Sequence, residues 1–545
     1  MQIVKLTLRS AMKAGFIVMT LAMFSCSKQS KLANHIPKDA TAVLAFDVKS
    51  IGLKSLDFKE IMNLENLKKA LTTPDDSATE NFKNSGIDFL EKAYFFGKAA
   101  EEGKSYGAAI VGLADANKFE ALIKKLNKEV AIATDGNFKS AAFGDKGIVG
   151  WNESEAILLF GSENPKETIL ALANLKKEES LASNSKAFSD LENEKADIAC
   201  WVSFEDFQKV IPQYGMAMGA PGLASMNLKE TFVTATCNFE DGQIVIGSKY
   251  MTNDEMTKKF NFIKPNISKD VAQALPGKSV IAMMGFGIDM NKLYAYLEEQ
   301  KLLEPVDASA TQMTGLTVKE IFGMLTGDVA VTLNDIGMKD VKAMDYMTGQ
   351  MIDKKQPNPD YCAVIGIADK AKATQLLTHF VEAGMLTKNE NYYSLQNEVF
   401  IIEKDNSLTL VGTESAKQFA LDGKGEKLND ELSALLSENA SSIYLNFGNI
   451  PESFYASGNA MIGTNIKNTS VEDIVITSSA VENNVTTGKW VIRFKDKSQN
   501  SLITLAQISK KFSDVFAAPP APVIVSDTEE PVIVEETSEE PVVSN

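Results

Sequence analysis

Five blocks of this sequence occur twice, in the same order, along the chain. The clearest pair is AAIVGLADANKFEALIKKL at 108–126 and CAVIGIADKAKATQLLTHF at 362–380, in which Asp115 aligns with Asp369. The other pairs are 36–56 with 275–297, 147–169 with 399–419, 196–207 with 441–454, and 230–250 with 473–494. Because a recurring order of blocks indicates a repeated structural unit, we predict two homologous domains, 36–265 and 270–516.

Within each copy, helix and strand signals are mixed rather than strictly alternating. Asp115 and Asp369 have the carboxylate that caps a helix N-terminus, and the apolar spacing after Asp115 indicates one buried helix face. Short polar turns, NES, KDNS, FEDG and NNVTTG, separate pairs of apolar runs and predict antiparallel hairpins. We therefore predict an α+β fold in which each domain is a mostly antiparallel sheet with helices on one face. The cleft between the domains is the expected ligand site.

The N-terminus has the pattern of an export signal. Three basic residues precede the apolar run AGFIVMTLAMF, which is too short to span a bilayer comfortably and ends at Ser25-Cys26. Met23-Phe24-Ser25-Cys26 resembles the lipobox of bacterial lipoproteins, in which the cysteine is acylated and becomes the new N-terminus. We therefore expect a signal peptide over 1–25, lipid attachment at Cys26 and a linker over 26–35. By the same resemblance, Ser27 implies the outer membrane, on either its periplasmic or its surface side.

Composition excludes several classes of function. The formal net charge of −17, without a Lys/Arg cluster, argues against nucleic acid as a partner. With histidine only at 35 and 379, sites that need several histidines are excluded, and we expect His379 to fill a partly buried position on a helix. The last segment, 517–545, has five Pro and seven acidic residues and no Lys or Arg, which predicts a disordered acidic tail.

Motifs that carry catalysis are missing from the sequence. It has no phosphate loop, dinucleotide fingerprint, HExxH, CxxC or GxSxG. We predict no catalytic residue, metal or cofactor. Apart from Cys26, the cysteines Cys200, Cys237 and Cys362 lie in apolar strand-like segments, where buried free thiols are expected and a Cys200–Cys237 bridge is the alternative.

Two segments rich in Gly, Ala and Met occupy equivalent places in the copies. They are 214–227 and 455–468, and their methionines Met216, Met218, Met226 and Met461 are candidate binding residues for peptide or lipid. A duplicated structural loop would explain the same pattern. Separately, Asp76-Ser77-Ala78 resembles a short bacterial O-glycosylation acceptor, which makes Ser77 a candidate modification site.

The lipobox, the motif Ile36-Pro37-Lys38-Asp39-Ala40 before an apolar strand, and the duplicated body together resemble an uncharacterised lipoprotein family, the domain of unknown function numbered 4836. This resemblance implies a cell-envelope location and supplies no activity. We predict a lipid-anchored binding or scaffolding protein, more readily a non-enzyme than an enzyme, with an envelope protein, peptide, glycan or lipid as its partner. The alternative is an envelope glycan or peptide hydrolase that uses carboxylates in the cleft between the domains.

Overall fold

A computed structural model gives the fold of the chain. It describes residues 30–54, 84–99, 105–144, 147–205, 227–344, 349–396, 398–451, 454 and 470–517. Several sequence predictions lie outside the described residues: the signal peptide, lipid attachment at Cys26, modification of Ser77, the acidic tail beyond Ala517, and the candidate methionines Met216, Met218, Met226 and Met461.

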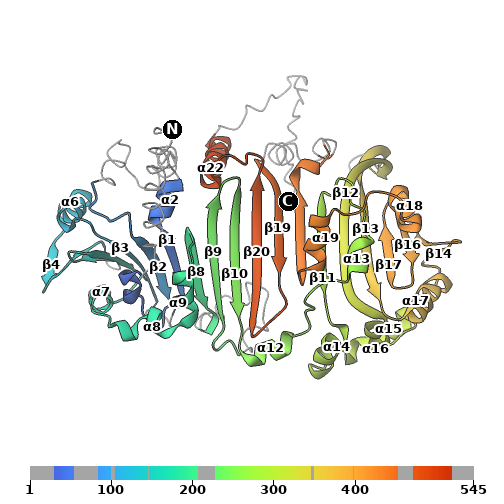
Figure 1. Cartoon of the computed structure of the whole chain (residues 1–545), viewed down its shortest axis with the longest axis horizontal. Coiled ribbons are helices and arrows are strands. Elements are labelled where there is room, and N and C mark those ends of the chain that lie inside the picture. Colours follow the sequence, from blue (N-terminus) through green and yellow to red (C-terminus); the bar gives the residue numbers. More distant parts are fainter. Residues whose placement is uncertain are drawn as a thin grey trace, which may run out of the picture.

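One antiparallel sheet of 20 strands runs through the whole molecule (Figure 1). The strands of the first half are β1 (Ala42–Asp47), β2 (Lys92–Lys98), β3 (Tyr106–Gly112), β4 (Ile132–Asp135), β5 (Phe138–Ala142), β6 (Gly147–Trp151), β7 (Glu155–Phe160), β8 (Ile198–Ser203), β9 (Phe232–Glu240) and β10 (Gln243–Met251). Those of the second half are β11 (Ala282–Gly287), β12 (Leu325–Met344), β13 (Met351–Ile367), β14 (Thr387–Lys388), β15 (Tyr393–Leu395), β16 (Val399–Glu403), β17 (Ser407–Val411), β18 (Ser441–Asn446), β19 (Val471–Ser478) and β20 (Val485–Phe494).

The strand order of the first half is repeated in the second. From one end to the middle it is β4-β5-β6-β7-β3-β2-β1-β8-β9-β10. From the other end it is β14-β15-β16-β17-β13-β12-β11-β18-β19-β20. The halves join where β10 pairs antiparallel with β20, and the middle pair of this ladder is Gly247 with Lys489. This is the arrangement expected of two duplicated units related by a pseudo-twofold axis.

Helices cover one face of the sheet in each half, and we call this the helical face. It is marked by the buried residues Val43, Trp201, Met283 and Val364. In the first half it carries η1 (Lys31–His35), α7 (Pro165–Ala173), η2 (Lys177–Glu179), α8 (Leu181–Asn184) and α9 (Lys186–Asn193). In the second half it carries α13 (Lys269–Gln273), α18 (Glu414–Asp422) and α19 (Asp430–Ser437). The predicted α+β class with a largely antiparallel sheet is confirmed.

The opposite face, which we call the reverse face, carries further helices. Near one end of the sheet, α6 (Ala116–Leu126) packs through Phe119 and Ile123 on Val149 and Trp151 of β6. Near the other end, α16 (Val318–Met324) and α17 (Lys370–Glu382) pack on Ile367 and Leu408. The last helix, α22 (Ser501–Ala517), packs on Ile244 and Ile492. The remaining helices are α2 (Val48–Lys54), α12 (Asp254–Phe260), α14 (Met290–Glu299), α15 (Glu304–Thr314) and η4 (Phe447–Asn449).

Local sequence signals account for many of these elements. The Asp115 carboxylate accepts hydrogen bonds from the backbone N–H groups of Asn117 and Lys118, and Asp369 accepts one from Lys372. Both residues are therefore the helix caps that the sequence predicts. The hairpins predicted around the four polar turns are β6–β7, β16–β17, β9–β10 and β19–β20.

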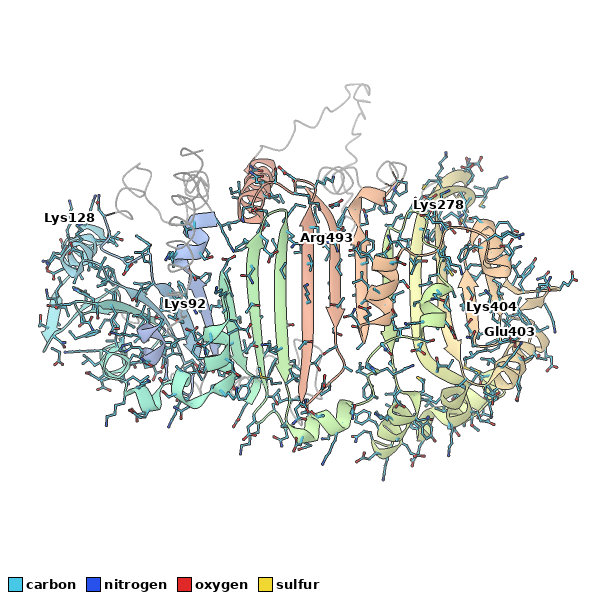
Figure 2. The ribbon with its side chains drawn as sticks, in the orientation of Figure 1. Lys92, Lys128, Lys278, Glu403, Lys404 and Arg493 are labelled. Carbon is cyan, nitrogen blue, oxygen red and sulfur yellow. The ribbon has the colours of Figure 1, made fainter. Side chains whose placement is uncertain are left out.

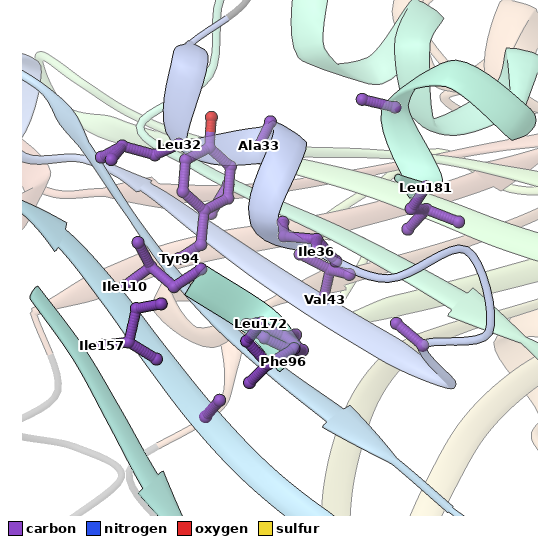
Figure 3. Packing of buried hydrophobic residues seen from close by; sticks show 14 of the residues in the cluster. Leu32, Ala33, Ile36, Val43, Tyr94, Phe96, Ile110, Ile157, Leu172 and Leu181 are labelled. Atoms are coloured by element: carbon purple, nitrogen blue, oxygen red, sulfur yellow. The ribbon is translucent and has the colours of Figure 1, made fainter. Parts of the chain in front are cut away.

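Part of the interval predicted as a linker belongs to the folded core. Leu32 and Ala33 of η1 are buried, and Figure 3 shows them beside Tyr94 of β2. His35 fastens the end of η1: its Nε2 lies 3.0 Å from Glu155 Oε2, and its Nδ1 lies 3.1 Å from the Leu172 carbonyl oxygen. Apolar side chains at 32, 33 and 36 explain why this segment packs on the sheet instead of extending into solvent.

Candidate functional site

A groove lies on the helical face at the junction of the two halves. Its volume is about 980 Å³, and its floor is formed by the four central strands β9, β10, β20 and β19. The end of α9, the end of α19 and the segment between α12 and α13 form its sides, through Glu194, Glu438 and Ile263 among others. The groove therefore lies between the helical layers of the two halves, where none of the described helices lies above the sheet.

The floor of the groove is polar because the central strands carry polar side chains on the helical face. The register places Thr236, Gly247, Lys489 and Thr477 in one row across the four central strands. A second row contains Thr234, Lys249 and Thr487. These positions point to the same side as the buried Trp201 of β8, which is paired with Thr234. Hydroxyl and ammonium groups thus replace apolar side chains where the helical layer stops.

Gly247 keeps the middle of the floor open. A Cβ atom added at this position would lie 3.1 Å from Thr236 Oγ1. The missing side chain leaves room above the row between Thr236 and Lys489.

The charges of the groove come in equal numbers of both signs. Its lysines are Lys249, Lys292 and Lys489, and its carboxylates are Glu194, Glu438 and Glu482. Lys249 Nζ lies 2.5 Å from Glu194 Oε1, which links β10 to the end of α9. Five hydroxyl-bearing residues on this side of the strands complete the polar lining: Thr234, Thr236, Thr477, Ser479 and Thr487. Such a surface offers hydrogen-bond donors and acceptors along its whole length.

Facing buried carboxylates, which the alternative prediction of a hydrolase needs, are missing from the described lining of the groove. Glu438 and Glu482 are exposed, and Glu194 is paired with Lys249. The buried carboxylates of the described residues are outside the groove lining and have structural partners. Glu192 accepts from Tyr94, and the other four are in the ion pairs Asp328–Lys264, Asp197–Lys54, Glu155–His35 and Asp473–Arg493.

Beside the groove, one ion pair joins the central strands to α19. Arg493 of β20, labelled near the middle of the sheet in Figure 2, contacts Glu431 at 2.8 Å and Asp473 at 3.5 Å. Burial raises the pKa of Asp473, against the opposing effect of Arg493. This cluster joins β19 and β20 to the start of α19, and the residues after the other end of that helix line the groove.

Of the three cysteines predicted to be buried, Cys362 is buried, whereas Cys200 and Cys237 are only partly buried. Cys200, Cys237 and Cys362 are free thiols, and burial raises the pKa of each. Cys200 and Cys237 lie on the neighbouring strands β8 and β9 without the alternative bridge. His379 is half-buried on α17. Within the described part of the chain, no group of three or more His, Cys, Asp or Glu residues could hold a metal ion.

The sequence prediction missed the residues of the groove floor. Alternation in FVTATCNFE places Thr234 and Thr236 on one side of a strand, and this pattern was available from sequence. Their partner Lys489, however, is more than 250 residues away along the chain, and only the pairing of β10 with β20 brings the two halves together. The candidate methionines could not be compared with the groove because they lie outside the described residues.

Helices of the described residues are all too short or too polar to cross a bilayer.

Comparison with curated proteins gave no match. Solved structures of TP0453 share limited similarity with the chain. Crystal form IV covers 40% of this chain and 79% of its own, with 9% identity and a TM-score of 0.26, and crystal form I covers 42% and 80%, with 11% identity and a TM-score of 0.25. At these scores the likeness supports no conclusion about fold or function.

The sequence as a whole matches one family model. The match extends over residues 32–502 and so includes both halves of the sheet and the groove between them. The chain belongs to the family described as domain of unknown function DUF4836.

Proposed function

We propose that this protein is a lipid-anchored protein of the cell envelope that binds a short peptide segment of a partner in the central groove. The observation that carries the proposal is the polar floor at the junction of the halves, where hydroxyl groups and balanced charges replace the apolar core. A volume of about 980 Å³ is within the range of sites that enclose small ligands.

The chemistry of the lining favours a peptide over a polymer of one charge. A polyanion would meet Glu194, Glu438 and Glu482, and a polycation would meet three lysines. A peptide backbone, in contrast, has a donor and an acceptor in every residue and matches the row of hydroxyl groups. Binding is preferred to hydrolysis because the described lining has no buried pair of carboxylates to act as acid and base.

Attachment to the membrane rests on Cys26 and is tested separately. Two or three acyl chains hold a protein stably on a membrane, because each buried CH₂ contributes about 0.8 kcal/mol. We expect Cys26→Ala to move the protein from the membrane fraction to the soluble fraction of fractionated cells. If the variant stays in the membrane fraction, the proposed lipid anchor is wrong.

Site-specific crosslinking in the native envelope tests the groove. A photoreactive amino acid at Thr236 should capture a peptide segment that mass spectrometry can identify, whereas the same group at Thr134, on β4 far from the groove, should not. A synthetic copy of the captured segment should then bind the purified protein.

A charge reversal in the floor gives the matching affinity test. Lys489→Glu should weaken binding of the synthetic peptide at least tenfold, and Lys495→Glu, just beyond β20 and outside the groove lining, should leave it unchanged. Equal effects of the two variants, or cleavage of the peptide by the wild-type protein, would refute peptide binding as the function.

A further inference from the structure

A second pocket lies in the second half, at the point where β12 and β13 leave the sheet. Its volume is about 490 Å³. It is lined by parts of β12, β13 and α18, by the segments that precede β11 and follow α18, and by Asn449 of η4. Figure 2 labels Lys278 of this lining near the top of the second half. The described lining residues all differ from those of the central groove, so this pocket is a separate place on the molecule.

A β-bulge in β12 brings oxygen-bearing side chains together in this pocket. The pairing with β13 runs up to Leu333–Tyr361 and resumes at Asp335–Asp360, so Asn334 is an extra residue in β12. In a bulge, two residues of one strand oppose one residue of the other. Asn334, Asp335 and Asp360 all line the pocket. We call it the bulge pocket after these three residues.

The two carboxylates of the bulge pocket face each other without a counter-charge. Asp335 and Asp360 are directly opposite across the antiparallel pair, a relation in which like charges are destabilising. Their hydrogen-bond donors are neutral: Asp335 accepts from the backbone N–H of Ile336 at 2.7 Å, and Asp360 accepts from the Thr413 hydroxyl. Neither carboxylate forms an ion pair with a described residue. A cation that entered the pocket would relieve this repulsion.

The side chain of Asn334 independently indicates a missing donor. This residue is 8% exposed, and its Nδ2 donates to the carbonyl oxygens of Pro276 and Lys278, at 3.2 Å and 2.9 Å. Both of these partners line the pocket as well. The other end of the amide, Oδ1, is buried without a hydrogen-bond partner. Because a buried acceptor is costly when it is left unpaired, this oxygen favours an occupant that brings an N–H or O–H donor.

The first half places an ammonium group of its own at the equivalent position. Leu333 pairs with the first residue of β11, as Gly97 of β2 pairs with the first residue of β1, so Asn334 corresponds to Lys98. The Lys98 Nζ lies 2.5 Å from Asp39 Oδ2. In the second half an amide replaces this lysine, and the two carboxylates nearby have no protein cation as a partner.

We propose that the bulge pocket binds a small molecule through a primary ammonium group. An ammonium group has three N–H donors, and it would meet three acceptors here, one from Asn334 and one from each carboxylate. It is favoured over a metal ion because no group of three or more His, Cys, Asp or Glu residues that could hold a metal occurs among the described residues. The proposal does not depend on peptide binding in the central groove.

Two sources of such a group are compatible with the rest of the lining. Lys278 and Lys424 also line the pocket and are exposed. They would attract the carboxylate of a free amino acid and would repel the second ammonium group of a polyamine. The experiment therefore compares the two classes directly.

Isothermal titration calorimetry with cadaverine and with L-lysine tests the proposal. The protein is the mature chain (residues 26–545) carrying Cys26→Ala, and choline is the control ligand, because it has the charge but no N–H donor. We expect saturable binding of a primary amine and none of choline. Tighter binding of lysine assigns the pocket to amino acids, and tighter binding of cadaverine assigns it to polyamines.

Conservative variants link the binding to the bulge pocket. Asp335→Asn and Asp360→Asn should each weaken binding by about tenfold or more, since each removes one charged acceptor. Asp340→Asn, also on β12 but outside the described lining, should leave binding unchanged. The amine should raise the melting temperature of the wild type more than that of Asp335→Asn. Without the amine, Asp335→Asn should melt no lower than the wild type, because the like charges no longer face each other.

Three results would overturn the proposal. The first is that neither amine binds the wild-type protein, or that Asp335→Asn and Asp340→Asn bind it equally well. The second is choline binding as tight as that of the primary amines, since charge alone would then explain the binding. The third is binding of Ca²⁺ that Asp335→Asn abolishes, without binding of either amine, since that would make the carboxylates metal ligands.

Discussion

Buried charged side chains bind segments that are distant along the chain through hydrogen bonds and ion pairs, and Asp197 is the clearest example. Its side chain is 1% exposed, and its two oxygens accept hydrogen bonds from Ser50, Lys54 and the backbone N–H of Phe239. These donors belong to α2 and β9, so one carboxylate connects the helix after β1 with the strand next to the central ladder. Every oxygen of this buried group has a partner, as a stable buried charge requires.

Asp197→Ala should therefore destabilise the protein by about 3 kcal/mol, because it leaves Lys54 and the Phe239 N–H without their acceptor. Chemical denaturation with a fluorescence readout measures the change. Asp190→Ala is the control, since Asp190 is 57% exposed and its pair with Lys186 should contribute about 0.5 kcal/mol or less. If the two variants lose similar amounts of unfolding free energy, the buried Asp197 contributes no more to stability than the exposed Asp190.

His35 makes the docking of η1 depend on pH. The hydrogen bond and charge of Glu155 raise the pKa of His35 above 6.5, although burial opposes this. A raised pKa in the folded state means that the contribution of His35 to stability is complete below pH 6.5 and is lost as the pH rises through the folded pKa. The difference in melting temperature between wild type and His35→Ala should accordingly be larger at pH 5.5 than at pH 8.5. A difference that is constant, or grows with pH, would contradict this assignment.

Among the elements, the hairpin of β12 and β13 differs most from its counterpart. Both strands continue past the sheet, and from Ile336–Pro359 to Met344–Met351 they pair only with each other. The equivalent strands β2 and β3 have seven residues each. Met344, Met351 and Ile352 at the end of the hairpin are 59%, 60% and 42% exposed, so this arm contributes little to the core.

Replacing 338–357 by a two-residue Asn-Gly turn should shorten the arm and lower the melting temperature by only a few degrees. The cut joins Gly337 to Asn358, which are paired in the ladder, and the Lys339–Glu398 ion pair that is lost is partly exposed. Differential scanning calorimetry gives the measurement. A drop of 10 °C or more would show that the arm supports the sheet.

At the scale of the whole molecule, the two halves share one sheet. The β10–β20 ladder has a continuous register from Gln243–Arg493 to Met251–Val485, so the halves are joined by backbone hydrogen bonds as well as by the chain between them. The cleft between domains expected from the sequence is consequently a groove above a continuous floor. The same ladder forms the floor of the groove and the middle of the reverse face.

Because of this ladder, we expect the halves to unfold together. Calorimetry should show one transition whose van't Hoff enthalpy equals its calorimetric enthalpy. Val491→Pro removes a donor in the middle of β20 and should reduce this coupling. Two separate transitions in the wild-type protein would mean that the halves are independent in stability.

The sequence alone determined the features that depend on neighbouring residues. Asp115 and Asp369 cap helices because the acceptor and the N–H groups lie within three residues of one another, and the four polar turns make hairpins for the same local reason. The repeat of five blocks likewise predicted two similar halves, and the strand order follows it. Packing of η1 was missed, because its apolar residues are too few to form a periodic pattern.

Tertiary structure alone decided where the two halves meet and what lies on each face there. Thr236 and Lys489 share a groove, and Ile246 and Trp490 share an apolar face, only because β10 pairs with β20 in one register. A shift by one residue would exchange the two faces of either strand. No local pattern specifies this pairing, since its partners lie more than 200 residues apart and their free energy comes from the whole assembled sheet.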